Sequence, residues 1–212
     1  MQDEEKQNEL SEFFADINTT KGKIINVACE ILKKGNYQSM TTSEIANAAN
    51  ISEGTIYRYF SSKKEILLTI LDELNNYFVK TFFNGLDQSQ NLEEKLMIIG
   101  NNFFIYKDKL VGLYSIIFNV FSEIKDEEVK QKFKLIYDKI LMQISKLLYN
   151  ENDIILKENT QNILASFFLC GAGELLWKLD IVNDGNILNK NLIEKMLKTI
   201  FKILEIEKNK KE

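Results

Sequence analysis

A short segment of the chain carries side chains suited to contact with nucleic acid. Residues 51–60 are Ile-Ser-Glu-Gly-Thr-Ile-Tyr-Arg-Tyr-Phe. Ser52 is a good helix-capping residue, and Ile56 and Phe60, four residues apart, would anchor one face of that helix to a core. The remaining groups are hydroxyls, phenols and a guanidinium, from Thr55, Tyr57, Arg58 and Tyr59. Groups of these kinds donate hydrogen bonds to phosphates and to base edges.

Arg58 is the only arginine in the chain. On a helix in the major groove, a guanidinium can bond to O6 and N7 of guanine as a bidentate pair. It could instead bind a phosphate or simply be solvated, and the sequence leaves these alternatives open. Gly54 has no side chain, so the backbone beside it could approach DNA closely.

Short helices must position these groups. Capping residues precede three successive apolar patterns: Thr19 or Thr20, then one of Thr41, Thr42 and Ser43, then Ser52. Gly35 ends the first predicted helix, and the third covers Glu53–Phe60. Two short helices joined by a tight turn have the geometry of a helix-turn-helix, whose second helix enters the major groove.

The rest of the chain also has helical periodicity. Ser61 and Ser62 lead into a long fourth helix whose inward positions are Ile66, Leu67, Ile70, Leu71, Leu74 and Phe78. A polar break over residues 85–91 is followed by five more predicted helices: Leu92–Tyr106, Leu110–Phe121, Glu127–Tyr149, Glu158–Leu179 and Asn189–Glu207. With no strand alternation, the pattern predicts an all-α fold of about nine helices.

The composition argues against an enzyme. The chain has no histidine, which removes the commonest general base and the commonest metal ligand. Its two cysteines, Cys29 and Cys170, are too few and too distant for a zinc cluster. We therefore predict no catalytic residues, no metal and no cofactor. Each cysteine lies in an apolar pattern, which favours a small buried side chain, with a redox-sensing thiol as the alternative.

Charge is unevenly distributed along the chain. The formal net charge is −4. Residues 1–18 carry Lys6 against six carboxylates, whereas residues 19–71 carry six lysines and Arg58 against four glutamates. The positive charge thus lies on the segment with the DNA-binding pattern. No apolar run approaches the roughly 20 residues that span a bilayer, and the acidic N-terminus does not have the pattern of a secretory signal. We expect a cytoplasmic protein that does not enter membranes.

The segment Lys23–Thr69 resembles the TetR family of transcriptional regulators. The resemblance lies in Thr42-Ser43-Glu44-Ile45-Ala46, in residues 51–60 and in Ser62-Lys63-Lys64-Glu65. It implies a helix-turn-helix domain over residues 19–66, after an acidic lead over 1–18. A ligand-binding and dimerisation domain would follow over 67–212. By the resemblance, Thr42 and Lys63 bind phosphates and residues of the third helix face DNA: Gly54, Thr55, Tyr57, Arg58 and Tyr59. For Ser52, capping alone is favoured over an added phosphate contact.

Two positions and the acidic lead depart from the family pattern. Asn50 stands where the family usually has a glycine in the turn, and asparagine tolerates the positive φ that such a turn needs. The acidic lead replaces a basic arm, so we predict no contact between this lead and the minor groove. Glu53, on the recognition helix, would repel phosphate but could accept a hydrogen bond from cytosine N4.

The resemblance stops near Phe78, and pattern must guide the rest. The last predicted helix has a broad apolar face, and the helix before it carries small residues that permit close helix approach. In the family these two helices form the dimer interface, for which we select Gly171, Leu175, Leu179, Leu192, Met196, Ile200 and Ile203. An ordinary monomer core is the alternative.

The central helices are rich in aromatic residues. Such side chains can line an apolar ligand pocket, although aromatics at helical spacing are more often plain core. The resemblance favours a pocket, with candidate residues Phe103, Phe104, Tyr114, Phe118, Tyr137, Phe167, Cys170 and Trp177.

The sequence thus predicts a DNA-binding regulator. The favoured hypothesis is a homodimeric repressor that binds a palindromic operator on double-stranded DNA and is released by a small apolar or aromatic effector. The alternative is a DNA-bound interaction platform of the same fold without an inducer.

Overall fold

The computed structural model describes residues 16, 18–87, 90–150, 153–154, 171, 178, 182–183, 187 and 189–209. The chain divides into two compact units. Unit 1 comprises Met1–Phe78 and Asp108–Ile136, and unit 2 comprises Val79–Lys107 and Tyr137–Glu212. Most of the acidic lead and most of the predicted helix Glu158–Leu179 lie outside the described residues.

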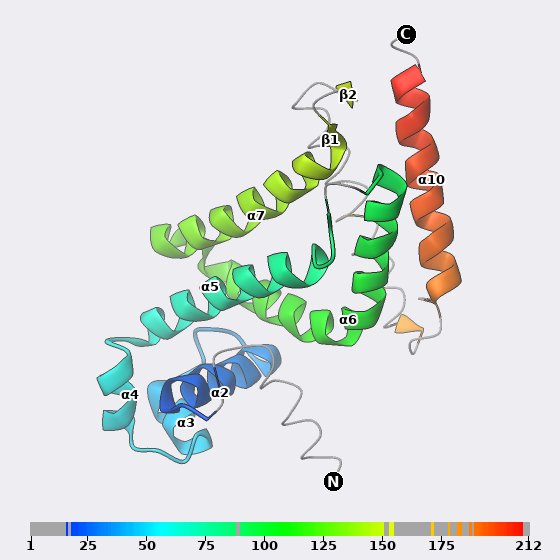
Figure 1. The fold of residues 1–212 in the computed structure, drawn as a ribbon. Helices are drawn as coiled ribbons and strands as arrows, with labels where there is room; N and C mark the ends of the chain where they lie inside the picture. The colour runs from blue at the N-terminus through cyan, green and yellow to red at the C-terminus, as the bar shows by residue number, and fades with distance from the viewer. Residues whose placement is uncertain are drawn as a thin grey trace. The chain divides into compact units, whose positions relative to one another are not determined.

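The described residues are mainly helical (Figure 1). The helices are α2 (Thr20–Lys34), α3 (Thr42–Ala48), α4 (Glu53–Tyr59), α5 (Lys63–Phe82), α6 (Leu92–Val120), the 3-10 helix η1 (Phe121–Lys125), α7 (Glu127–Leu148) and α10 (Lys190–Asn209). Two short strands, β1 (Tyr149–Asn150) and β2 (Asp153–Ile154), pair antiparallel, and the sequence did not predict them. The predicted all-α fold class is confirmed.

Side chains cap the helices of the predicted helix-turn-helix. Oγ1 of Thr19 accepts from the backbone N–H of Gly22 at 3.0 Å, and Oγ1 of Thr41 accepts from that of Glu44 at 3.1 Å. Each bond satisfies an N–H group that a helix start leaves without a partner. The capping choices left open by the sequence are thereby settled as Thr19 and Thr41.

One predicted break in a helix was wrong. The sequence suggested separate helices over Leu92–Tyr106 and Leu110–Phe121, whereas α6 runs unbroken from Leu92 to Val120. The residues between the two predicted helices are Lys107, Asp108 and Lys109, a polar run. Lysine and aspartate do not stop a helix, however, and the run contains neither glycine nor proline.

Unit 1 has a continuous apolar core under α2, α3 and α4. All six predicted inward positions of α5 are buried, as are Ile24 and Leu32 of α2, Ile45 of α3 and Ile56 of α4. Cys29 is also fully buried, and burial raises the pKa of its thiol. A buried neutral thiol fits the small apolar role rather than redox sensing.

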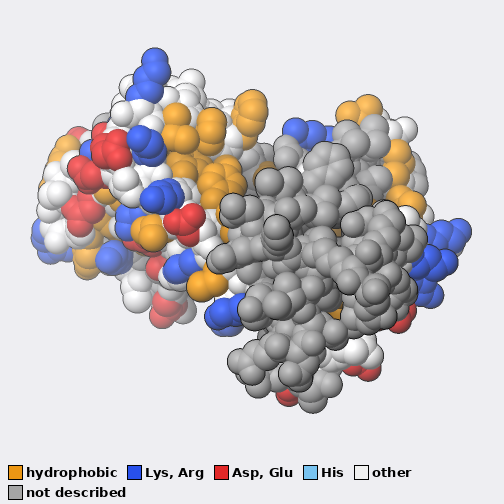
Figure 2. Space-filling model, turned by 90° about the horizontal axis from the view of Figure 1, so that it is seen from above, with side chains coloured by type: hydrophobic (Ala, Val, Ile, Leu, Met, Phe, Trp, Pro, Cys, Tyr) orange, Lys and Arg blue, Asp and Glu red, His pale blue; other side chains and the backbone are white. Residues whose placement is uncertain are grey.

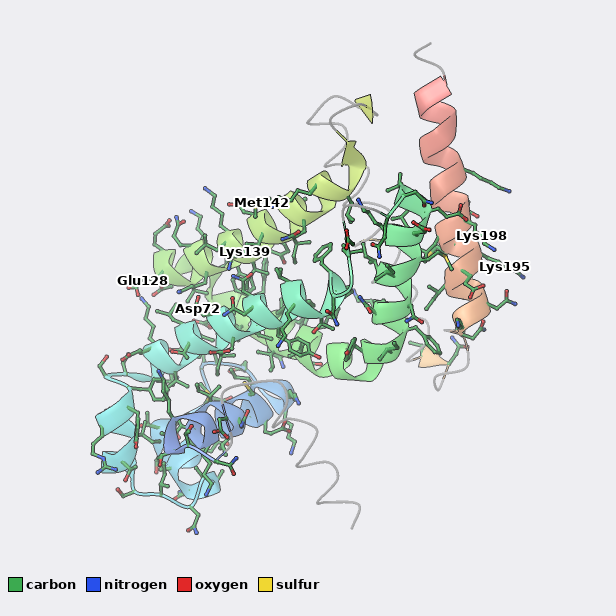
Figure 3. The ribbon with its side chains drawn as sticks, in the orientation of Figure 1. Asp72, Glu128, Lys139, Met142, Lys195 and Lys198 are labelled. Carbon is green, nitrogen blue, oxygen red and sulfur yellow. The ribbon has the colours of Figure 1, made fainter. Side chains whose placement is uncertain are left out.

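Polar contacts fasten the helix-turn-helix to the later segment of unit 1. Asn119 Nδ2 donates to the carbonyl of Leu32 at 2.7 Å, and so ties α6 to the end of α2. Gln38 Nε2 donates to Glu123 Oε2 at 2.7 Å. Asp72 on α5 faces α7 (Figure 3), and Lys132 Nζ lies 2.6 Å from its carboxylate.

Within unit 2, α10 packs closely on the first half of α6 (Figure 1). Ile193 and Leu197 of α10 are buried there. A Cβ added at Gly100 would lie 2.2 Å from Leu197 Cδ1 and 2.9 Å from Ile193 Cγ2. Any larger residue at position 100 would force the side chains of Leu197 and Ile193 to shift. This pairing was not predicted, because Gly100 lies inside an otherwise ordinary helical pattern.

The described residues contain neither a membrane-spanning helix nor a cluster of metal ligands. None of the helices there is long and apolar enough to cross a membrane. In the same part of the chain, no three His, Cys, Asp or Glu residues form a group that could hold a metal ion.

Candidate DNA-binding surface

Recognition helix α4 is fixed at both ends by local bonds. Ser52 Oγ accepts from the backbone N–H of Thr55 at 3.2 Å and lies 2.8 Å from the hydroxyl of the same residue. The backbone N–H of Phe60 donates to the carbonyl of Ile56 at 2.9 Å. Ile56 and Phe60 are both buried, as predicted. Capping by Ser52 is confirmed, and a phosphate contact by its hydroxyl stays a prediction.

The turn between α3 and α4 depends on Asn50. Its φ is 53°, in the left-handed region that asparagine tolerates better than most residues. Next to it, the backbone N–H of Ile51 donates to the carbonyl of Ala46 at 3.0 Å. The prediction that asparagine preserves the turn in place of glycine is confirmed.

The outer face of α4 presents the predicted DNA-contacting groups. Tyr57 is 54% exposed and Tyr59 is 40% exposed, and Arg58 lies between them with its guanidinium carbon 5.9 Å from the centre of the Tyr59 ring. Their exposed phenol groups and the guanidinium can donate hydrogen bonds to phosphates and base edges. A Cβ at Gly54 would meet only Ser52 Oγ, at 3.8 Å, so the protein's own packing does not require a glycine there.

Thr42, at the start of α3, contacts α4 directly. Its hydroxyl donates to Glu53 Oε1, and its oxygen lies 3.4 Å from the hydroxyl oxygen of Tyr57. The structure therefore brings together Thr42 and Tyr57, both predicted DNA contacts, with a carboxylate between the two helices. The sequence analysis noted Glu53 only as a source of repulsion and did not predict its bond to Thr42.

Lys63 has partners within the protein. Its Nζ donates to the carbonyls of Tyr37 and Met40, at 3.0 and 2.9 Å, and lies 4.3 Å from the centre of the Tyr37 ring. These bonds join the head of α5 to the loop before α3. A contact between Lys63 and a phosphate would require its ammonium group to exchange some of these partners, and that contact stays a prediction.

The neighbouring charged residues are paired as well. Lys64 Nζ lies 2.7 Å from Asp126 Oδ2 and 2.9 Å from Glu128 Oε1. Its hydrogen bond lowers the pKa of Asp126, and the bonds to Asp126 and Glu128 raise the pKa of Lys64. Hydrogen bonds from Ser61 lower the pKa of Glu65 in the first turn of α5.

Comparison with known protein families identifies the family of this helix-turn-helix domain. Residues 24–70 match the family model of the bacterial regulatory proteins of the tetR family. The chain carries the TetR family's DNA-binding domain. It is a DNA-binding transcriptional regulator and not an enzyme.

Individual relatives agree with this assignment. The chain is similar to the fatty acid metabolism regulator protein of Bacillus subtilis, with 29% identity over 82 residues, which cover 39% of this chain and 42% of that one. The match thus spans less than half of that regulator's length. An uncharacterised helix-turn-helix regulator of Lactococcus lactis is 26% identical over 196 residues, covering 88% of this chain and 95% of the relative.

A solved structure shows the same fold over most of the chain. The structure of the regulator FadR from Bacillus subtilis, in complex with stearoyl-CoA, aligns with a TM-score of 0.63 at 20% identity. The alignment covers 84% of this chain and 96% of the other.

The predicted pocket residues of this TetR-family chain are distributed over both units. In unit 2, Phe103 stacks on Phe82 with ring centres 6.2 Å apart, and Phe104 is half-buried. In unit 1, Tyr114 meets Phe78 edge-on at 5.8 Å. The other predicted residues are either exposed, as are Phe118 and Tyr137, or outside the described residues, as are Phe167, Cys170 and Trp177. The pocket stays a prediction.

Among the described residues of this set, Phe118 is the most exposed, at 81%. Within unit 1 it does not lie in an enclosed cavity. Exposed hydrophobic side chains also occur along α7, at Leu135, Tyr137 and Met142. Hydrophobic side chains gather among charged ones on the face shown in Figure 2, and Figure 3 places Met142 and Lys139 on α7.

The predicted dimer residues are only partly described. Leu192 and Met196 are half-buried on α10, whereas Lys195 and Lys198 of the same helix are exposed (Figure 3). Gly171 is exposed, and a Cβ there would meet nothing within 4 Å. The side chains of Ile200 and Ile203, and the residues Leu175 and Leu179, lie outside the described part. The TetR-type dimer interface is therefore untested and stays a prediction.

Proposed function

We propose that this regulator is a repressor that binds a palindromic operator as a homodimer and is released by a small apolar effector. The observation that carries this proposal is the outer face of α4. Tyr57, Arg58 and Tyr59 are exposed there, on a helix that Ile56 and Phe60 anchor to the core. This is the arrangement that a helix needs in order to present side chains to the major groove.

A homodimer suits this mode of binding. Two recognition helices about one helical turn apart would contact the two halves of a palindrome. Residues 19–66 would then supply the DNA contacts, and residues 67–212 the dimer interface and the effector site. Leu192 and Met196, half-buried on α10, support an interface there because they add apolar surface beside the buried Ile193 and Leu197. We propose the cytoplasm as its place of action, since that is where a bacterial operator lies.

The aromatic residues of α6 and the FadR structure support this proposed effector class. That structure contains stearoyl-CoA, a molecule with a long apolar chain. An apolar chain of this kind would suit a site lined by Phe103 and Phe104 of α6. Effector binding would shift α5 and change the separation of the two recognition helices. Simultaneous contact with both half-sites would then be lost, although no single DNA contact changes.

The first experiment is a fluorescence anisotropy titration on DNA from immediately upstream of the protein's own gene. Wild type, Arg58→Ala and Tyr57→Phe are compared at several salt concentrations. We expect saturable, salt-sensitive binding that Arg58→Ala weakens by roughly 1–3 kcal/mol. Lys63→Met belongs in the same series. If Lys63 binds a phosphate, its loss would also reduce the slope of log affinity against log salt concentration by about 1 for each phosphate contact removed.

Effector release is tested on the same complex. Stearoyl-CoA and free CoA are added separately at equal concentration. Release by stearoyl-CoA alone would support an apolar-chain effector. Binding at many genomic sites with release by neither compound would favour the interaction platform. Wild-type protein that binds no duplex more tightly than an acidic control protein would contradict the DNA-binding proposal itself.

A further inference from the structure

Glu53 occupies an unusual place on the DNA-binding surface. It is the first residue of α4, it is exposed, and its carboxylate accepts a hydrogen bond from Thr42 of α3. The hydroxyl of Tyr57 lies 3.4 Å from the same Thr42 oxygen. A negative charge therefore lies against Thr42, next to a second group that would face DNA.

The bond to Glu53 restricts what Thr42 can do. A threonine hydroxyl has a single hydrogen, and in the unbound protein Thr42 donates it to the carboxylate. A DNA phosphate can only accept hydrogen bonds. The Thr42 hydroxyl can therefore donate to a phosphate only after its bond to Glu53 is broken. A carboxylate that stays near the phosphate also repels it, because both groups are negative.

We propose that Glu53 is a specificity-determining residue. Its carboxylate takes the place of a DNA phosphate at Thr42 in the unbound protein, and it weakens binding to any DNA that offers it no hydrogen-bond donor. Where a cytosine lies opposite the start of α4, the carboxylate leaves Thr42 and accepts from the N4 amino group. On DNA without a cytosine at this place, the Glu53 carboxylate has no hydrogen-bond donor on the bases and lies beside the phosphates, which repel it. The inference rests on the DNA binding proposed above.

A purely structural role for Glu53 predicts the opposite result. A carboxylate in the first turn of a helix interacts favourably with the helix dipole. If that were its only role, neutralising Glu53 would loosen α4 and weaken binding to every duplex. Under our proposal, the same change strengthens binding to DNA of random sequence, because the repulsion disappears while Thr42 is released more easily.

The test measures affinity for two duplexes, one of random sequence and one from upstream of the gene. Glu53→Gln is compared with wild type and with Glu30→Gln, which removes the same charge from α2, where Glu30 pairs with Lys33 at 2.8 Å. We expect Glu53→Gln to bind the random duplex roughly tenfold more tightly, and the upstream duplex with a smaller gain or a loss. The gain should shrink as salt rises, because salt screens exposed charges.

A second variant tests the contact with Thr42. In a Thr42→Val background, the gain from Glu53→Gln should be smaller, since there is no longer a hydroxyl for the change to release. Far-ultraviolet circular dichroism confirms that each variant is folded. Unchanged or weaker binding of Glu53→Gln to the random duplex, or an equal gain from Glu30→Gln, overturns the inference while leaving the DNA-binding function standing. Wild-type protein that binds neither duplex would instead reject the proposed function.

Discussion

The helix-turn-helix and the α6–α10 pair of unit 2 are built from the same kind of helix but differ in what constrains their residues. In the helix-turn-helix, short helices are fixed by caps at Thr19, Thr41 and Ser52 and by one left-handed turn at Asn50. In unit 2, close packing at Gly100 decides the contact between α6 and α10. The family model matches only residues 24–70, whereas the FadR structure matches the fold of most of the chain at 20% identity.

This difference has a physical reason. Every double-stranded DNA presents the same phosphate spacing and groove, so a DNA-contacting helix needs particular residue types at fixed spacing. A helical bundle needs only apolar residues of suitable volume at helical spacing, which many sequences supply. Residue types at fixed local spacing therefore determine the structure of the helix-turn-helix. The packing of segments distant in sequence determines the structure of the α6–α10 pair.

The largest expected effect comes from removing the anchor of α4. Phe60→Ala deletes a buried aromatic ring and should lower the free energy of unfolding by about 3–5 kcal/mol. Urea unfolding followed by circular dichroism measures the loss, and DNA binding should disappear with it. The neighbouring Tyr59→Ala is the matched control, because its ring is exposed and its loss should change stability by about 0.5 kcal/mol or less. Equal losses from both variants would mean that α4 is not anchored as described.

A smaller effect is expected from overpacking unit 2. The Cβ of Gly100→Val would overlap Leu197 and Ile193, at a cost of about 1–3 kcal/mol in the free energy of unfolding. Gly54→Ala is the contrasting change on α4, where a Cβ has room, so it should leave stability unchanged or raise it by up to about 1 kcal/mol. In a thermal melt, Leu197→Ala should restore part of the stability that Gly100→Val loses. No recovery would argue against direct contact at this position.

The smallest effect is a pH dependence of stability in unit 1. The hydrogen bond from Lys64 lowers the pKa of Asp126, so this pair stabilises the fold above the ordinary aspartate pKa and loses that contribution as pH falls through the lowered value. The pKa of Lys64 is raised, so its contribution is present below the ordinary lysine pKa and is lost as pH rises through the raised value. Melting temperatures across acidic pH should show a flatter decline for Lys64→Met than for wild type. Lys134→Met, on the exposed face of α7, serves as the control and should leave the decline unchanged.

Much of the helix-turn-helix could be predicted because its determinants are local. A cap bonds to a residue three positions away, and a turn needs one residue of the right type, so Ser52, Asn50 and the inward face of α5 all follow from spacing. The same reasoning failed at α6, where two separate helices were predicted although no residue between them ends a helix.

The contacts that the sequence did not predict join residues far apart or depend on side-chain reach. The bond from Thr42 to Glu53 links two helices, and Lys63 spans the gap to the loop before α3. Spacing along one helix carries no information about either contact. Lysine in particular has a long flexible stem, so its residue type fits a phosphate contact and an internal bond to carbonyls equally well.

The contacts that attach the helix-turn-helix to the rest of unit 1 affect the order in which the chain folds during its synthesis. Asn119 bonds to Leu32 across 87 residues, and Gln38 bonds to Glu123 across 85. Contacts between α2, α3 and α4, by contrast, join residues close in sequence, and such contacts form quickly because they close short loops. During synthesis the three helices can therefore form while α6 is still inside the ribosome, and their attachment completes only after Asn119 and Glu123 have emerged.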